Sequence, residues 1–108
     1  MVKEIRTFDL SITAGSTEEE TFTAEKDLIV EKILITERSG NALNNVHALI
    51  TLNDEPLTRP SVPCVVFGET YNEGMPLRFS LPKGSKLKFR VTNNSSTDVT
   101  IDIALLIE

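Results

Sequence analysis

Apolar and polar residues alternate over most of the chain, and this period-two pattern predicts β-strands. The first alternating segment runs from about Ile5 to Thr13. Within it we expect Phe8, Leu10 and Ile12 to face inward, because they share one parity. No long apolar pattern has helical spacing, so we predict no α-helix beyond a turn or two. The pattern therefore indicates an all-β protein.

Similar alternations predict further short strands, for a total of about eight. They lie near residues 20–24, 28–36, 46–52, 64–67, 77–81, 87–91 and 99–107. Over residues 28–36 the alternation is blurred, so either both faces are covered or a bulge shifts the register. Residues 53–63 are predicted to form an irregular loop, because their prolines cannot donate to a sheet ladder. Residues 68–76 form the second long loop of the prediction.

The length and composition are those of one globular domain. The chain has 108 residues, of which 40% are hydrophobic and 25% charged, which is enough to build a single core. No internal repeat or shift in composition divides the sequence. We therefore predict that residues 1–108 form one antiparallel β-sandwich.

Two topologies fit this strand pattern. In an immunoglobulin-like or cupredoxin-like sandwich, the last two strands would form a hairpin with Lys88 opposite Asp102. In a jelly roll the same strands lie in opposite sheets, and these two residues are far apart. We favour the jelly roll because the connections are long and the strands number about eight.

Net charge and segment hydrophobicity exclude several classes of function. The formal net charge is −5, whereas binding to a nucleic-acid backbone depends on a surplus of Lys and Arg, so we expect no nucleic-acid partner. We expect neither a signal peptide nor a transmembrane segment, because no suitable apolar run is present. The lone Cys64 cannot form an internal disulfide.

Few residues could carry chemistry. The order His47, Cys64, Met75 superficially resembles a cupredoxin copper site, but a blue-copper centre needs a second histidine and the chain has one. His47 is predicted to be an ordinary strand residue and Cys64 a small buried hydrophobe. The basic stripe of Arg78, Lys86, Lys88 and Arg90 lacks interleaved aromatic residues and is expected to be a solvated face. We therefore predict no enzymatic activity, no metal and no cofactor.

The strands carry more apolar surface than one core can bury. Residues 104–107 are apolar on both faces, as is much of residues 28–35. We therefore predict a homo-oligomer, a trimer or another small closed ring, in which the C-terminal strand contributes to the interface. The candidate interface residues are Leu28, Leu34, Ala104 and Leu106. As an alternative, Leu106 lies under a segment of its own chain.

The style of residues 21–30 (TFTAEKDLIV) and 81–94 (LPKGSKLKFRVTNN) resembles small jelly-roll proteins that build or decorate the shells of phages and archaeal viruses. This resemblance implies a non-enzymatic structural subunit, docked on a capsid shell or on further copies of itself, and a location in the virion. A ligand-binding or carbohydrate-binding sandwich module is the competing hypothesis. Its contact surface would come from the two long loops, around Arg59, Phe67 and Tyr71.

Overall fold

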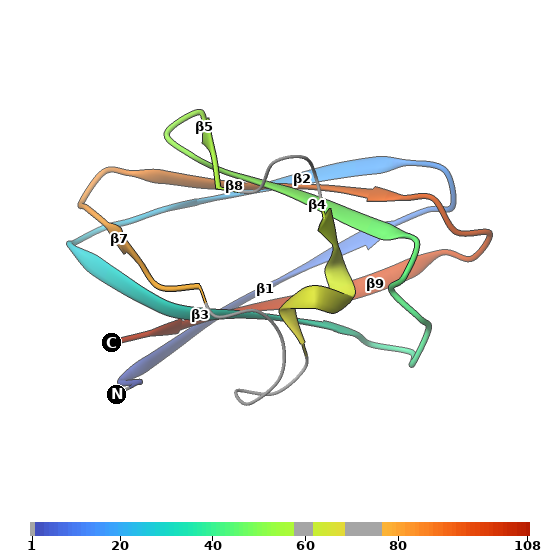
Figure 1. The fold of residues 1–108 in the computed structure, drawn as a ribbon, viewed down its shortest axis with the longest axis horizontal. Helices are drawn as coiled ribbons and strands as arrows, with labels where there is room; N and C mark the ends of the chain where they lie inside the picture. Colours follow the sequence, from blue (N-terminus) through green and yellow to red (C-terminus); the bar gives the residue numbers. More distant parts are fainter. Residues whose placement is uncertain (1, 58–61, 69–76) are drawn as a thin grey trace.

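The computed structural model describes residues 2–57, 62–68 and 77–108, which form two facing antiparallel sheets (Figure 1). Sheet A has the strand order β1-β9-β3-β7, and sheet B has the order β2-β8-β4-β5, with β6 also paired to β4. The strands are β1 (Glu4–Ile12), β2 (Thr17–Thr23), β3 (Leu28–Glu37), β4 (Val46–Leu52), β5 (Glu55–Pro56), β6 (Val62–Pro63), β7 (Phe79–Leu81), β8 (Lys86–Asn93) and β9 (Val99–Ile107). A single 3₁₀ turn, η1 (Cys64–Phe67), is the only helical element within this part of the chain.

The strand order is that of a jelly roll. Consecutive strands lie in opposite sheets, except that β4, β5 and β6 all belong to sheet B. The last two strands therefore do not form a hairpin, as the jelly-roll prediction requires. Lys88 lies in sheet B, where its ammonium is 3.5 Å from Glu19, and Asp102 lies in sheet A, where Arg38 binds it at 2.6 Å.

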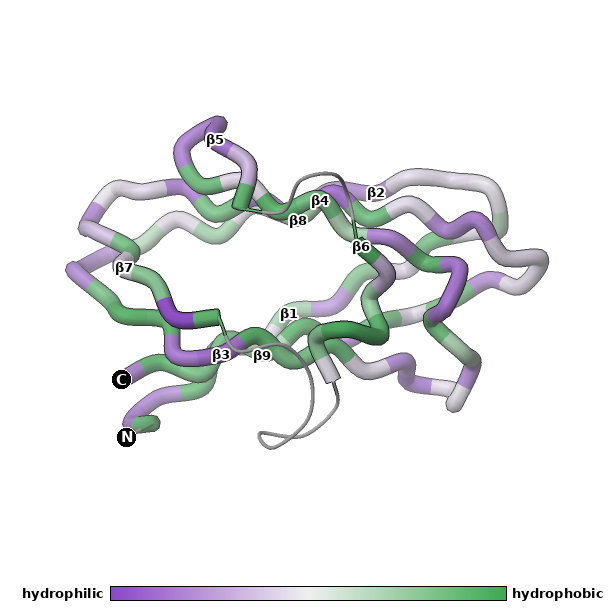
Figure 2. Tube along the Cα trace, in the orientation of Figure 1, coloured by the Kyte–Doolittle hydropathy of each residue, from purple (hydrophilic) through white to green (hydrophobic). Residues whose placement is uncertain are grey.

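The core lies between the sheets and is built from alternate residues of each strand. In β9 the odd-numbered residues from Val99 to Ile107 are buried, as the period-two pattern predicts. Apolar residues recur along the strands of both sheets (Figure 2), and those that are buried form one core cluster. Phe8 and Phe89 join the two sheets by an edge-to-face contact with ring centroids 5.3 Å apart.

A bulge explains the blurred alternation in β3. Its register against β9 shifts between Val30 and Lys32. Because one residue is inserted there, even-numbered residues such as Val30 face inward before the shift, and odd-numbered residues such as Ile33 and Ile35 face inward after it. Lys32 and Leu34 are thereby placed on the outer face of sheet A.

Two local expectations need correction. The segment predicted to be an irregular loop begins with a tight hairpin, because Asn53 and Asp54 adopt φ of 50° and 69° and join β4 directly to β5. The strand expected at residues 64–67 is η1 instead. Cys64 and Phe67 are both fully buried and stand three residues apart, which is the repeat of a 3₁₀ turn.

The described residues include no helix long enough and apolar enough to cross a bilayer.

Candidate functional site

The outer face of sheet A carries the most distinctive surface of the described residues. Strand pairing places Ile5 beside Leu106 and Leu106 beside Lys32. The next outward row consists of Thr7, Ala104 and Leu34. We call these two rows the apolar rows, although one end of the first row is a lysine.

Ile5 is the residue that exposes this surface to solvent. Its side chain is 59% exposed, more than any other large hydrophobic residue among those described. It was absent from the candidates drawn from the sequence. The alternation could have identified it. Phe8, Leu10 and Ile12 are even-numbered and face inward, so the odd-numbered Ile5 must face outward.

The predicted interface residues divide between the core and this outer face. Leu34 and Ala104 are half-buried in the apolar rows. Leu28 belongs to the core at 5% exposure and pairs with Leu81, so it lies on the inner side of sheet A and not in the apolar rows. Leu106 is also only 5% exposed within a single chain, with Ile5 and Lys32 as its cross-strand neighbours. This low exposure agrees with the alternative that Leu106 is covered by its own chain.

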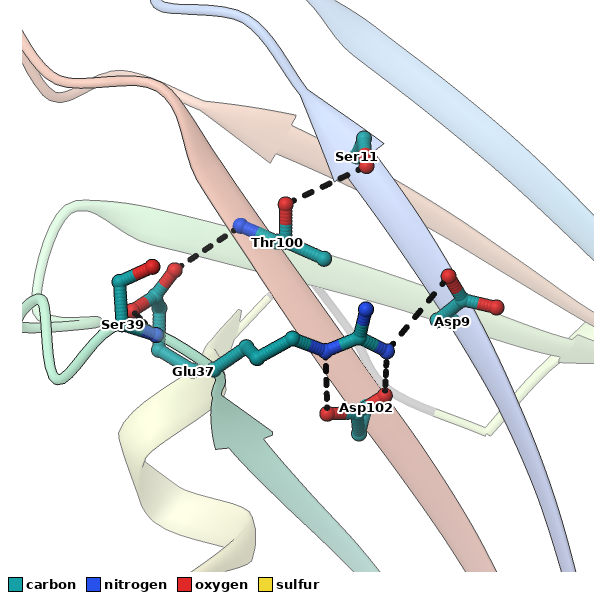
Figure 3. A network of polar contacts seen from close by, with 7 residues as sticks. Asp9, Ser11, Glu37, Ser39, Thr100 and Asp102 are labelled. Atoms are coloured by element: carbon teal, nitrogen blue, oxygen red, sulfur yellow. Dashed lines mark hydrogen bonds and ion pairs between the residues drawn. The ribbon is translucent and has the colours of Figure 1, made fainter.

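A cluster of charges lies two strand positions beyond the apolar rows, towards the loop that follows β3. The guanidinium of Arg38 donates to both carboxylate oxygens of Asp102, at 2.6 and 3.3 Å, and lies 3.7 Å from a carboxylate oxygen of Asp9 (Figure 3). Hydrogen bonding to Arg38 lowers the pKa of Asp102. Two carboxylates share one guanidinium, so this cluster has a net negative charge.

Beside this cluster, Glu37 fixes the start of the loop between β3 and β4. Glu37 is 8% exposed, and its carboxylate accepts backbone N–H bonds from Ser39 at 2.6 Å and Thr100 at 2.9 Å (Figure 3). It also accepts a backbone N–H bond from Asn41 at 2.8 Å. Burial alone would raise the pKa of Glu37, but the hydrogen bonds outweigh it and the pKa is lowered. Glu37 therefore acts as a structural anchor that ties the loop to β9.

At the opposite end of the outer face of sheet A, near Lys3 and Glu108, the side chains carry a net positive charge. Arg78 donates to both carboxylate oxygens of Glu108, at 2.7 and 3.0 Å, and this pairing lowers the pKa of Glu108. Lys3 is exposed and close enough to Glu108 to lower that pKa further, while Glu31 acts on Arg78. Together with Lys32 of the first apolar row, which is only 9% exposed, this end holds three cations and two carboxylates.

His47 and Cys64, the two described residues of the superficial copper-site resemblance, face different surroundings. Cys64 is fully buried, and burial raises the pKa of its thiol to about 12, so it is held as a neutral thiol. His47 pairs with Pro63 in the ladder, but it is half-buried on the outer face of sheet B while Cys64 faces the core. Nowhere in residues 2–57, 62–68 and 77–108 do three or more His, Cys, Asp or Glu side chains gather as metal ligands. Met75 lies outside the described residues.

Sheet B presents a polar outer face. Lys86 and Arg90 are exposed on β8, and Lys88 between them is paired with Glu19. The basic stripe is thus partly neutralised within the chain. A shallow hollow of about 290 Å³ lies between this stripe and the Asn53–Asp54 turn.

The loop surface proposed for a ligand module is altered by the structure. Phe67 is fully buried in the core, so its ring is not available to a ligand, which corrects the prediction that it forms a contact surface. Arg59 and Tyr71 lie outside the described residues. A polar hollow of about 440 Å³ is present elsewhere, at the end of the sandwich. Its lining residues are Asn41, Ala42, Asn44, Asn45, Ser95 and Thr97.

Asn93, next to this hollow, is a structural residue. Its fully buried amide donates to the carbonyl oxygens of Ile12 at 3.0 Å and Thr97 at 2.8 Å. Its oxygen accepts from the backbone N–H and the hydroxyl of Ser95. The amide therefore organises the loop between β8 and β9, in agreement with the turn chemistry of this segment.

Comparison with known proteins adds no relative: no protein-family model, no curated protein and no solved structure matches the chain.

Proposed function

We propose that this protein is a non-enzymatic structural subunit, a jelly-roll sandwich that associates with copies of itself in a larger assembly such as a viral shell or its decoration. The jelly-roll fold is compatible with this role, since it recurs in capsid proteins, although it also occurs in lectins and in other families. The fold by itself does not select the function. The proposal therefore depends on the surface of sheet A.

The observation that carries the proposal is the exposure of Ile5 within the first apolar row. Complete burial of an isoleucine is worth about 1.5 to 3 kcal/mol. Ile5 is 59% exposed, so covering this exposed part in an interface would contribute about 1 to 2 kcal/mol for each copy. Ala104 and Leu34 are half-buried and would add smaller amounts.

The size of this face predicts a weak individual contact. β1 and β9 each have nine residues, so three strands side by side measure about 30 Å by 14 Å at standard strand spacings. Two such faces would bury about 850 Å² in total, less than the 1,200 to 2,000 Å² of a typical stable interface. We therefore expect a dissociation constant of about 10 μM or weaker for one contact. Weak contacts of this kind suit a subunit held at several sites in a shell.

Sedimentation-velocity centrifugation of the purified chain, from about 1 μM to 1 mM, tests the proposal. We expect mass to increase with concentration, and Ile5→Lys to remain monomeric at concentrations where the wild type associates. Val65→Lys is the matched control, because Val65 is also an exposed hydrophobic residue, at 53%, but lies on η1 instead of sheet A. A wild-type chain that is monomeric over the whole range contradicts the proposal.

A further inference from the structure

We propose that two copies pair through the outer faces of their A sheets, related by a twofold axis. The axis lies in the interface between the two copies and runs perpendicular to the strands. In this arrangement the strands of the two copies are antiparallel, and Lys3 of one copy lies over Asp9 of the other. This inference rests on the proposed function and specifies its interface. The occupant of the apolar rows is thus a second copy of this chain.

The rows of the outer face determine where the axis passes. An axis between the two apolar rows lays the first row of one copy on the second row of the other. Leu106 then faces Ala104 of the second copy, which opposes a large side chain to a small one. Ile5 faces Thr7, and its exposed side chain is covered. A face paired with itself in this way is an isologous interface, the commonest kind among soluble oligomers.

The charges on the face are complementary under the same operation. The cluster of Asp9, Asp102 and Arg38 lies one row beyond the apolar rows and has a net negative charge. Lys3 lies one row beyond them in the other direction, because its backbone N–H extends the β1 ladder to Ile107. The twofold axis therefore lays Lys3 of each copy on Asp9 of the other. It also lays Glu108 on Asp102, and each of these two carboxylates is paired with an arginine of its own chain.

Other arrangements lose this complementarity. An axis parallel to the strands would lay each row on the same row of the second copy, so the negative clusters would face each other. Sheets that pack face to face are also rotated by about 30°, which displaces Lys3 sideways by about one strand. Asp102 is the cross-strand neighbour of Asp9, so a displacement towards β9 brings Lys3 to a second carboxylate. The charge pattern favours this twofold pair over the trimer or ring expected from the sequence.

The dissociation constants of Lys3→Glu, Asp9→Lys and the double variant test the arrangement. Each single variant turns two symmetry-related attractions into repulsions, and we expect about tenfold weaker association or more at low salt. The double variant restores opposite charges and is expected to return to within about threefold of the wild type. Asp9→Lys also removes the contact with Arg38 inside the chain, and the double variant still lacks that contact. Recovery in the double variant therefore reports on the contact between copies.

Lys26→Glu is the matched control for charge, because Lys26 is exposed in the turn between β2 and β3, and it should leave association unchanged. If both single variants associate like the wild type while Ile5→Lys is monomeric, the twofold arrangement is overturned and the proposed function is retained. If single variants weaken association but the double variant does not recover, the arrangement is likewise overturned. If the wild type does not associate at all, both proposals fail.

Discussion

Replacing Glu37 with Gln tests whether one carboxylate holds the β3–β4 loop against sheet A. The substitution keeps the size of the side chain and removes its charge. In the wild type, one carboxylate oxygen accepts from Ser39 and Asn41 and the other from Thr100. A glutamine that keeps its oxygen towards the loop turns an NH₂ group towards the Thr100 N–H, so two donors face each other.

The magnitude follows from the bonds that are lost. A hydrogen bond to a charged group contributes about 1.5 to 3 kcal/mol, and a buried donor left without an acceptor costs about 1 to 3 kcal/mol. Local relaxation recovers part of this loss, so we expect Glu37→Gln to reduce the free energy of unfolding by about 2 to 3 kcal/mol. For a domain of 108 residues, this corresponds to a fall in Tm of about 10 °C.

The effect should depend on pH in one direction. The folded protein lowers the pKa of Glu37 from its ordinary value of 4.5, because the charged form accepts the three backbone N–H bonds. The stabilisation from this lowered pKa is complete above the unfolded value and is lost as the pH falls through the folded pKa. The difference in stability between wild type and Glu37→Gln should therefore be constant near neutral pH and decrease below pH 4.5.

Urea unfolding followed by circular dichroism from pH 7 to pH 3 measures this difference. Glu18→Gln is the control, because Glu18 is exposed on β2 and its replacement should change stability by less than about 0.5 kcal/mol. A Glu37→Gln variant as stable as the control at pH 7, or a difference that grows on acidification, would refute the anchoring role of this carboxylate.

Three further predictions concern stability and reactivity. Phe89→Ala should cost about 3 to 5 kcal/mol in urea unfolding, because Phe89 is fully buried against Phe8; a loss below 1 kcal/mol would contradict its central packing. Asp54→Gly should raise the unfolding free energy by about 0.5 to 1 kcal/mol, since Asp54 has φ of 69° in the hairpin turn, and a destabilised variant would count against that turn geometry. Cys64, with its thiol pKa of about 12, should react with a thiol reagent only after unfolding, and labelling of the native protein at the rate of a free thiol would disagree with its burial.

Much of the candidate surface could have been derived from parity along single strands. The outward position of Ile5 follows from the inward set of β1, and the outward positions of Ala104 and Leu106 follow from the odd-numbered set of β9. The sequence could not show that Leu28 faces the core while Leu34 faces outward. This difference depends on the residue at which the bulge shifts the register of β3. Parity also gives no measure of coverage, so the burial of Leu106 required the neighbouring strands.

The sequence by itself determined the all-β class and the inward residues of most strands, because these depend on the local geometry of an extended backbone. For residues 28–36 it left two explanations open, and the bulge was identified only from the pairing of β3 with β9. Only the tertiary structure decided which strands pair. A period-two pattern states which face of a strand is buried and leaves its partner undefined, so it cannot show that β8 and β9 lie in opposite sheets. The charge clusters at the two ends of sheet A depend on that pairing, because Arg38 and Asp102 meet only where β9 runs beside β3.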